Sequence, residues 1–172
     1  MALALPTVDG TRADALRLVA EEACAAAGCA AAGVTVVDGD EVIVVGASPL
    51  GRRLVQEQWA AGEGPGLDAM RHLQPFNVAF LATATSWPAF ASFVVAQGVR
   101  SSLALPITLR GRALGALDLY SFEVEGFKGA EPMGLHFAAE AARVLTVDHG
   151  SAAAAAPGPD VPGRSRRSGA PS

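Results

Sequence analysis

The chain has 172 residues, a formal net charge of -4, 51% hydrophobic residues and only 6% aromatic residues. This length and apolar content predict one folded domain with a two-layer core and exclude a disordered or coiled-coil protein. Because a general nucleic-acid binder needs a basic face to displace counterions, the acidic balance excludes nucleic acid as an expected partner.

The first helix, a hairpin and further helices are predicted in the first half of the chain. Thr11-x-x-Asp14 resembles a capping box, and an apolar stripe follows it as far as Gly28. The β-branched runs 33–37 and 41–45 flank an acidic-Gly turn, which predicts an antiparallel hairpin. The segments that follow are predicted as a helix at 52–60, a shorter helix at 67–73 and an edge strand at 76–81.

The second half predicts a helix, a second hairpin and a final helix. Trp87-Pro88 opens the helix and Gly98 ends it. Strands at 103–109 and 113–120 flank Arg110-Gly111-Arg112, the strongest hairpin signal in the chain. Glu131-Pro132 begins a final helix that extends to about residue 147. This order of elements predicts an α+β domain with a mostly antiparallel sheet.

The composition changes sharply toward the C-terminus. Residues 151–172 contain six Ala, four Ser, four Pro, three Gly and three Arg, and such a segment buries too little apolar surface to offset the entropy lost on ordering. We predict an N-terminal extension over 1–10, a folded domain over 11–148 and a disordered tail over 149–172. The basic run at 164–167 is expected to be an inert part of that tail, with contact to an acidic surface or nucleic acid as the alternative.

No segment predicts a membrane span or a targeting signal. The longest uncharged apolar stretch, Ala23 to Val37, is too short to cross a bilayer and contains Gly28 and Gly33. Met1 to Pro6 is apolar but has no basic start. We therefore expect a cytoplasmic protein with no membrane partner.

The two cysteines, Cys24 and Cys29, lie five positions apart, mostly among alanines. In the cytoplasm they are expected to be free thiols that serve as small packing residues. A redox pair is the alternative, but the spacing is not CxxC and no basic residue lies nearby to favour a thiolate.

The alternation of side chains sorts the second hairpin into two faces. One face is bulky and apolar, with Leu103, Leu105, Ile107, Leu109, Leu117 and Leu119. The other is mostly small, with Ser102, Ala104, Pro106, Thr108, Leu114, Ala116, Asp118 and Tyr120. We expect packed helices on the first face and room for a pocket on the second.

The candidate ligand-binding residues are Trp87, Phe90, Phe93, Ala104, Asp118 and Tyr120. The aromatic residues of 87–93 share a helical face with a spacing suited to a pocket lid, and plain core positions explain them equally well. Asp118 is a candidate acceptor for a ligand; the alternative is a strand Asp that fixes a loop or a bulge.

The segment 62–66, Gly-Glu-Gly-Pro-Gly, is not expected to bind phosphate. Pro65 removes a backbone donor, and Glu63 places an anion where a phosphate would bind. A tight turn that leads into the next helix explains the segment instead.

Motifs for catalysis and metal binding are missing. His72, His136 and His149 have no partner at metal-ligand spacing, and none stands out as a haem ligand. No nucleophile elbow occurs. We therefore expect no enzymatic activity, no metal and no cofactor.

Several short motifs, taken in order, resemble those of a GAF domain. They are Gly62 to Ala69, Trp87-Pro-Ala-Phe90, Gly98-Val-Arg-Ser101, Leu103-Ala-Leu-Pro106, Gly115 to Ser121, and Phe127. More narrowly, the chain is similar over Arg12 to Val147 to the sensor half of actinobacterial GAF–ANTAR antitermination regulators, and its Arg-rich, lysine-poor composition fits such a source.

The resemblance implies a GAF-like (PAS-like) antiparallel sheet of five or six strands, with helices on one face and a ligand pocket on the other. It also implies a homodimer through the first and last helices. In the last helix the stripe expected on the sheet is Leu135, Ala138, Ala142 and Leu145, and the stripe available to a twin subunit is Phe137, Ala141 and Val144.

The chain departs from the regulators it resembles at several places. The Pro/Ala/Ser tail stands where an ANTAR module is expected, so RNA binding is not carried over. Gly66 replaces a usual cysteine, which removes a thiol-based sensing option, and Phe80 replaces a frequent acidic residue, which makes the pocket more apolar. The cyclic-nucleotide signature of other GAF branches is not visible.

We therefore expect a stand-alone sensory module that binds an unknown small molecule or a regulatory protein partner and signals through a helix-mediated dimer. The alternative is a degenerate transcription regulator without an output, acting only through protein–protein interaction. A third interpretation, a GAF-fold reductase such as the free methionine sulfoxide reductases, needs cysteines beside the pocket, whereas Cys24 and Cys29 lie at the end of the first helix.

Overall fold

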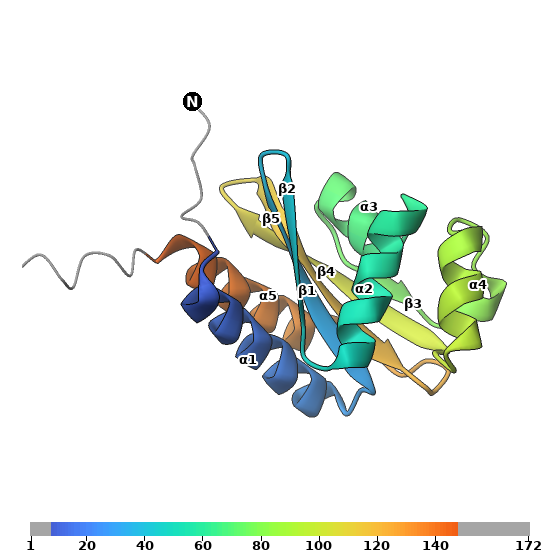
Figure 1. The fold of residues 1–172 in the computed structure, drawn as a ribbon. Helices are drawn as coiled ribbons and strands as arrows, with labels where there is room; N and C mark the ends of the chain where they lie inside the picture. The colour runs from blue at the N-terminus through green and yellow to red at the C-terminus, as the bar shows by residue number, and fades with distance from the viewer. Residues whose placement is uncertain (1–7, 148–172) are drawn as a thin grey trace, which may run out of the picture.

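A computed structural model describes residues 8–147 as a five-stranded sheet with helices on both faces (Figure 1). In chain order the elements are α1 (Gly10–Ala27), β1 (Ala31–Asp38), β2 (Glu41–Gly46), α2 (Pro49–Ala61), α3 (Pro65–His72), β3 (Phe76–Val78), the 3-10 helix η1 (Leu81–Thr83), α4 (Pro88–Ala96), β4 (Ser101–Leu109), β5 (Arg112–Ser121) and α5 (Glu131–Thr146). The predicted α+β class with an antiparallel sheet is confirmed. The tail predicted over 149–172, with His149, and residues 1–7 of the predicted extension lie outside the described residues.

The sheet has the strand order β2-β1-β5-β4-β3, and every neighbouring pair is antiparallel. Both predicted hairpins are present, β1 with β2 and β4 with β5. In the second hairpin, Arg110 and Gly111 both adopt left-handed backbone conformations, with φ of 50° and 73°, as a two-residue hairpin turn of this kind requires. The pairing of β1 with β5 then joins the two hairpins into one sheet.

Helices α1 and α5 lie side by side on one face of the sheet, over its larger apolar core (Figure 1). The predicted apolar stripe of the second hairpin faces this core, where Leu103, Leu105 and Leu117 are fully buried. Helix α5 approaches the sheet closely because Gly134 has no side chain: a Cβ at that position would come within 2.7 Å of Leu105.

Two details of this face differ from the sequence-based expectation. The register between β4 and β5 shifts after Ile107, so Leu114 has no partner opposite it. A bulge of this kind reverses the alternation of side chains, and Leu114 packs into the core under α1 and α5 instead of the pocket face. Helix α1 is capped by Asp9, whose carboxylate accepts from the Arg12 N–H at 2.9 Å, rather than by Thr11.

The apolar stripes of α5 are also divided differently from the prediction. Three of the four residues expected on the sheet are buried, but Leu135 is 42% exposed. In the stripe assigned to a twin subunit, Ala141 is fully buried, and Phe137 and Val144 pack against the core of the same chain. The physical reason is that α1 lies along α5 and covers much of that second stripe (Figure 1).

Helices α2, α3 and α4 lie on the opposite side of the sheet (Figure 1). Each of them begins at a proline, Pro49, Pro65 or Pro88, which suits a first helical turn because its N–H groups have no partner within the helix. A second, smaller apolar cluster forms under these helices. Within the described part of the chain, no helix is both long and apolar enough to cross a membrane.

Candidate functional site

The small-residue face of β4 and β5 is the floor of the candidate site. In the antiparallel register Asp118 lies opposite Ala104, and Tyr120 lies opposite Ser102. Residues paired in this way project from the same face of the sheet, which here is the face that α2 and α3 contact. The register therefore brings together three of the predicted site residues, Ala104, Asp118 and Tyr120, with Ser102 beside them.

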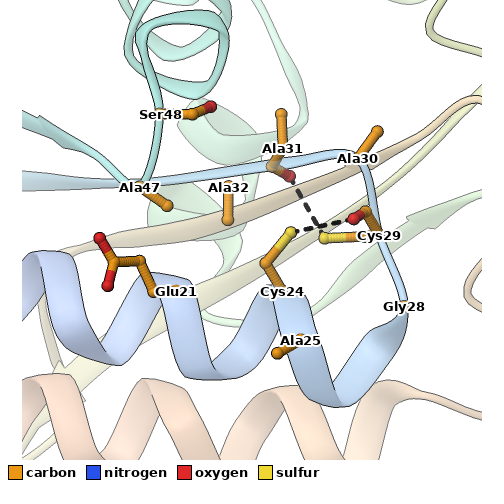
Figure 2. A pocket seen from close by; sticks show the side chains of 10 residues that line it. All are labelled: Glu21, Cys24, Ala25, Gly28, Cys29, Ala30, Ala31, Ala32, Ala47 and Ser48. Atoms are coloured by element: carbon orange, nitrogen blue, oxygen red, sulfur yellow. Dashed lines mark hydrogen bonds between the residues drawn. The ribbon is translucent and has the colours of Figure 1, made fainter.

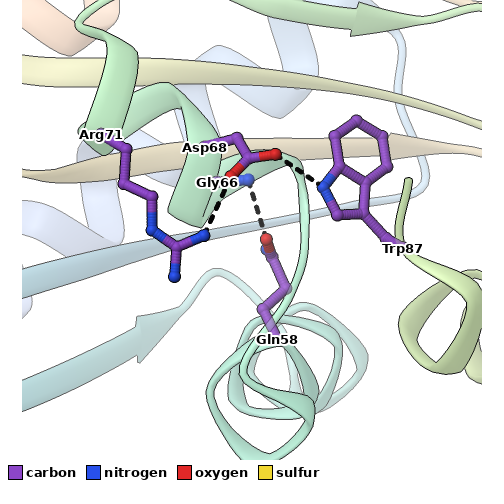
Figure 3. Close-up of polar contacts among 5 residues, drawn as sticks. All are labelled: Gln58, Gly66, Asp68, Arg71 and Trp87. Carbon is purple, nitrogen blue, oxygen red and sulfur yellow. Dashed lines mark hydrogen bonds and ion pairs between the residues drawn. The ribbon is translucent and has the colours of Figure 1, made fainter.

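A glutamine from α2 connects this floor to the helices above it. Gln58 Nε2 donates to Asp118 Oδ1 at 3.0 Å and to the Tyr120 hydroxyl at 2.9 Å. Gln58 Oε1 accepts from the Gly66 N–H at 2.8 Å, a contact visible in Figure 3. Because Gln58 is only 2% exposed, it joins β5, α2 and the start of α3 in one network shielded from water.

Asp118 is the titratable group at the centre of this network. Burial raises the pKa of its carboxyl from 3.8 to about 7, against the lowering effect of the hydrogen bond from Gln58. Burial, and then the charge of Asp118, raise the pKa of Tyr120 well above its ordinary value, so this phenol stays neutral. Near pH 7 Asp118 is therefore able to offer a ligand either an acid O–H, which can donate a hydrogen bond, or a carboxylate, which only accepts.

Two buried polar atoms on this floor have no hydrogen-bond partner among the described residues: Asp118 Oδ2 and Ser102 Oγ. Both residues are 1% exposed. An unpaired buried polar atom costs about 1–3 kcal/mol, and native proteins contain few of them. The floor thus retains hydrogen-bonding capacity that a bound molecule can use.

The glycine-rich segment 62–66 closes over Asp118. Gly66 packs directly on the carboxylate, and a Cβ at that position would lie 2.5 Å from Asp118 Oδ1. Glu63 Oε1 accepts from two backbone N–H groups at the start of α4, at 2.6 and 3.2 Å, where the helix dipole favours an anion. The segment therefore ties the connection between α2 and α3 to α4.

Trp87, the first predicted lid residue, precedes α4 and is 7% exposed. Its Nε1 donates to Asp68 Oδ2 at 2.8 Å, and the other carboxylate oxygen of Asp68 accepts from Arg71 at 3.0 Å (Figure 3). The indole also meets the Phe76 ring edge-on, with centroids 6.1 Å apart. Trp87 is thus held in place by both a polar and an aromatic contact.

The other two predicted lid residues have different surroundings. Phe90 is fully buried in the apolar cluster that also contains Tyr120. Phe93 is half-buried, and its ring centroid lies 5.4 Å from the guanidinium carbon of Arg53 on α2. Phe90 therefore packs in the same apolar cluster as Tyr120, whereas Phe93 packs against the outside of that cluster.

Gln58 and Gly66 were not among the predicted site residues. A signal for Gln58 exists in the sequence, because it shares a helical stripe with Leu54 and Val55, which are both buried. A polar residue on an apolar stripe of this kind indicates a buried hydrogen bond. No local signal marks the contact of Gly66 with Asp118, since it depends on how α3 is seated on the sheet.

Within the described part of the chain, the side chains that commonly bind metal ions do not form a cluster. Among residues 8–147, no three of His, Cys, Asp or Glu are arranged so that they could hold a metal ion. His72 and His136 are both exposed on helices.

The GAF domain family model matches residues 11–153. Three solved structures show the same fold. A domain of a two-component sensor histidine kinase protein from Sinorhizobium meliloti has a TM-score of 0.60 and 17% identity, over 78% of this chain and 90% of that one. GAF3 of Slr1393 from Synechocystis, in its photoproduct state, has a TM-score of 0.57 and 16% identity, over 76% and 90%. The free methionine-R-sulfoxide reductase from Neisseria meningitidis, in complex with its substrate, has a TM-score of 0.57 and 19% identity, over 81% and 79%.

No curated protein matches the sequence. The expectation that the chain is not an enzyme was wrong, because solved structures that share its fold include free methionine-R-sulfoxide reductases. At 19% and 14% identity the likeness concerns the fold alone. Sharing this fold therefore does not exclude catalysis.

Proposed function

Because the chain belongs to the GAF domain family, we propose that it is a sensory module that binds a small molecule on the sheet floor beneath α2 and α3. The observation that carries this proposal is the pair of unpartnered buried atoms, Asp118 Oδ2 and Ser102 Oγ, on one sheet face. A ligand with an N–H or O–H donor would satisfy Asp118, and a further polar atom of the ligand would reach Ser102.

The residues around this floor have different roles in the proposal. Asp118 and Ser102 bind the ligand, and Gln58 orients Asp118 through its hydrogen bond. Ala104 leaves space on the floor, and the Tyr120 hydroxyl accepts a second hydrogen bond from Gln58 Nε2. The aromatic residues Trp87, Phe90 and Phe93 supply the apolar wall, from the inside of the site to its margin.

Entry of a ligand requires the start of α3 to move away from the sheet, because Gly66 covers Asp118. Such a movement breaks the hydrogen bond between Gly66 and Gln58 and pulls on the contact of Glu63 with α4. A ligand that replaces these contacts would shift the population toward the open arrangement. The occupied and unoccupied states would thus differ in the positions of α3 and α4.

We extend the proposal to the output, which passes through α1 and α5 in a homodimer. Arg12 at the start of α1 donates to the Val147 carbonyl at the end of α5, at 3.0 Å, which links the two helices in addition to their packing. Leu18 on α1 and Leu135 on α5 are 54% and 42% exposed, which supports an apolar contact on these helices. The motif order described above supports kinship with the sensor halves of GAF–ANTAR transcription regulators, which pass their signal to a partner module or protein.

Native mass spectrometry of the full chain, purified from its own host, tests this proposal. The expected result is a dimer that carries a small additional mass, which is released on denaturation and is missing from the Asp118→Asn variant. Asp40→Asn, which changes an exposed turn residue in the same chemical way, is the matched control and should retain the mass.

A chain with no bound mass, whose melting temperature no compound of a metabolite library raises, would contradict ligand binding. Co-purification of a partner protein in that case would favour the alternative, a regulator that acts only through protein–protein interaction.

A further inference from the structure

A pocket of about 460 Å³ lies between the C-terminal half of α1, the start of β1 and the connection from β2 to α2 (Figure 2). Both cysteines of the chain line it, together with Glu21, Gly28, Ala31 and Ser48. Each cysteine is free and partly exposed. The volume is typical of sites that hold small molecules, so a low-molecular-weight reagent has access to both thiols.

The end of α1 explains why two cysteines five positions apart come together. Gly28 adopts the left-handed conformation with φ of 63° and reverses the chain. The Cys29 N–H then donates to the Cys24 carbonyl at 3.0 Å, and the Gly28 N–H donates to the Ala25 carbonyl at 3.2 Å. This pair of hydrogen bonds defines a Schellman motif, which places the side chains of its first and last residues in contact. Those residues are Cys24 and Cys29.

The thiol groups of both cysteines also form hydrogen bonds at this helix end. Cys24 Sγ donates to the Cys29 carbonyl at 3.2 Å, and Cys29 Sγ donates to the Ala31 carbonyl at 3.4 Å. Figure 2 shows the two sulfur atoms pointing toward each other at the edge of the pocket. A disulfide requires Cα atoms about 4.4–6.8 Å apart, and the direct backbone hydrogen bond holds these two residues close together.

The two thiols differ in acidity. The hydrogen bond with Cys29 lowers the pKa of Cys24, whereas the hydrogen bond with Cys24 and then burial raise the pKa of Cys29. Since the thiolate is the nucleophile in thiol–disulfide exchange, the direction of these shifts favours Cys24 as the first thiol to attack. The backbone hydrogen bond between the two residues keeps Cys29 next to the mixed disulfide that this attack would form. The turn at the end of α1 thus brings two thiols together although they are not spaced as a CxxC motif.

We propose that Cys24 and Cys29 form a thiol–disulfide exchange site, which a low-molecular-weight disulfide entering the pocket converts into an intramolecular Cys24–Cys29 disulfide. In the first step the Cys24 thiolate attacks one sulfur of the reagent RS–SR, which forms a mixed disulfide and releases RS⁻. In the second step Cys29 gives its proton to the RS⁻ released in the first step, and the resulting thiolate attacks Cys24 Sγ, which forms the protein disulfide and releases the second RS⁻. The two protein thiols are oxidised by two electrons, and the reagent is reduced to two thiols.

Oxidised glutathione is the probe for the test. The reduced full chain is incubated with it under native conditions, quenched with N-ethylmaleimide and digested with trypsin. Both cysteines fall in one tryptic peptide, Leu18 to Arg52. The expected product is this peptide with two hydrogens fewer, no maleimide and no glutathione, at more than tenfold higher yield than from the chain denatured in guanidinium.

Single variants test the order of the steps. Cys29→Ser should stop at one glutathione on Cys24, and Cys24→Ser should react at least tenfold more slowly than Cys29→Ser. Circular dichroism checks that both variants fold. Both side chains are partly exposed, so replacement by serine should disturb the fold little.

Separate glutathione adducts on both cysteines of the wild type, a disulfide between two chains, or recovery of both thiols as maleimide adducts would each overturn the proposal. Equal rates for the two serine variants would overturn the order of attack. The test does not involve Asp118, so its failure leaves the proposed ligand site unaffected.

Discussion

Replacement of Asp118 by asparagine changes how the stability of the fold depends on pH. The carboxyl is fully buried, and its pKa rises from 3.8 to about 7 in the folded chain. Asparagine has almost the same shape and keeps an oxygen that accepts from Gln58, but it does not titrate. Comparison of the two proteins therefore isolates the ionisation of this one group.

The sign of the effect follows from the two pKa values. Well below pH 3.8 the carboxyl is protonated in both the folded and the unfolded chain, so its contribution to folding is fully present. Between pH 4 and 7 the unfolded chain loses the proton while the folded chain keeps it, and the free energy of unfolding falls as the pH rises. Above pH 7 both states are ionised and the loss is complete, at about 4 kcal/mol for a pKa shift of this size.

Urea unfolding of wild type and Asp118→Asn at several pH values between 4 and 8.5 measures this contribution. The stability of the wild type relative to the variant should fall by up to about 4 kcal/mol across the range, while other titrating groups cancel in the difference. Asp40→Asn removes an exposed carboxylate and should show a flat difference. A flat difference for Asp118→Asn as well would refute the raised pKa and the description of Asp118 as a buried, half-ionised group.

Three further substitutions test the network around Asp118. Ser102→Ala removes a buried hydroxyl that has no partner. The free energy of unfolding of the ligand-free protein, measured in urea, should therefore rise by up to about 1 kcal/mol. A fall of about 1 kcal/mol or more would show that the hydroxyl has a hydrogen-bond partner in solution. Gln58→Met breaks the hydrogen bonds to Asp118, Tyr120 and Gly66. The free energy of unfolding, measured by thermal unfolding, should fall by about 3 kcal/mol. A fall of less than about 1 kcal/mol would contradict a buried network. Glu63→Gln keeps the acceptor at the start of α4 but removes its charge. The free energy of unfolding should fall by about 0.5–1 kcal/mol, and this fall should be smaller in about 1 M salt. A fall that salt leaves unchanged would exclude the helix dipole as its cause.

The candidate site shows the division between local and long-range information clearly. The small-residue face of the second hairpin could be predicted, because alternation along a strand and a two-residue turn are local properties. The bulge at Leu114 could not, since it depends on how β4 and β5 are aligned. Gln58 carried a readable signal as a polar residue on a buried stripe, whereas its partners on β5 lie 60 and 62 positions away along the chain.

The contact between the two cysteines is encoded locally in the sequence. The glycine between Cys24 and Cys29 ends the helix, and a glycine at a helix end commonly brings the residues before and after it together. The spacing rule for CxxC motifs pointed away from this contact, although the contact depends only on residues 24–29.

By itself the sequence determined the α+β class, the order of the helices and strands, and the motifs of the GAF family, because caps, turns and periodicity act over a few residues. Only the tertiary structure decided that α1 lies along α5, that α2 and α3 cover the small-residue face of the sheet, and that Gly66 closes over Asp118. These features depend on the relative placement of whole elements, which is set by side-chain packing between segments far apart in the chain. The chemical character of Asp118 follows from that placement, since burial changes the acidity of its carboxyl.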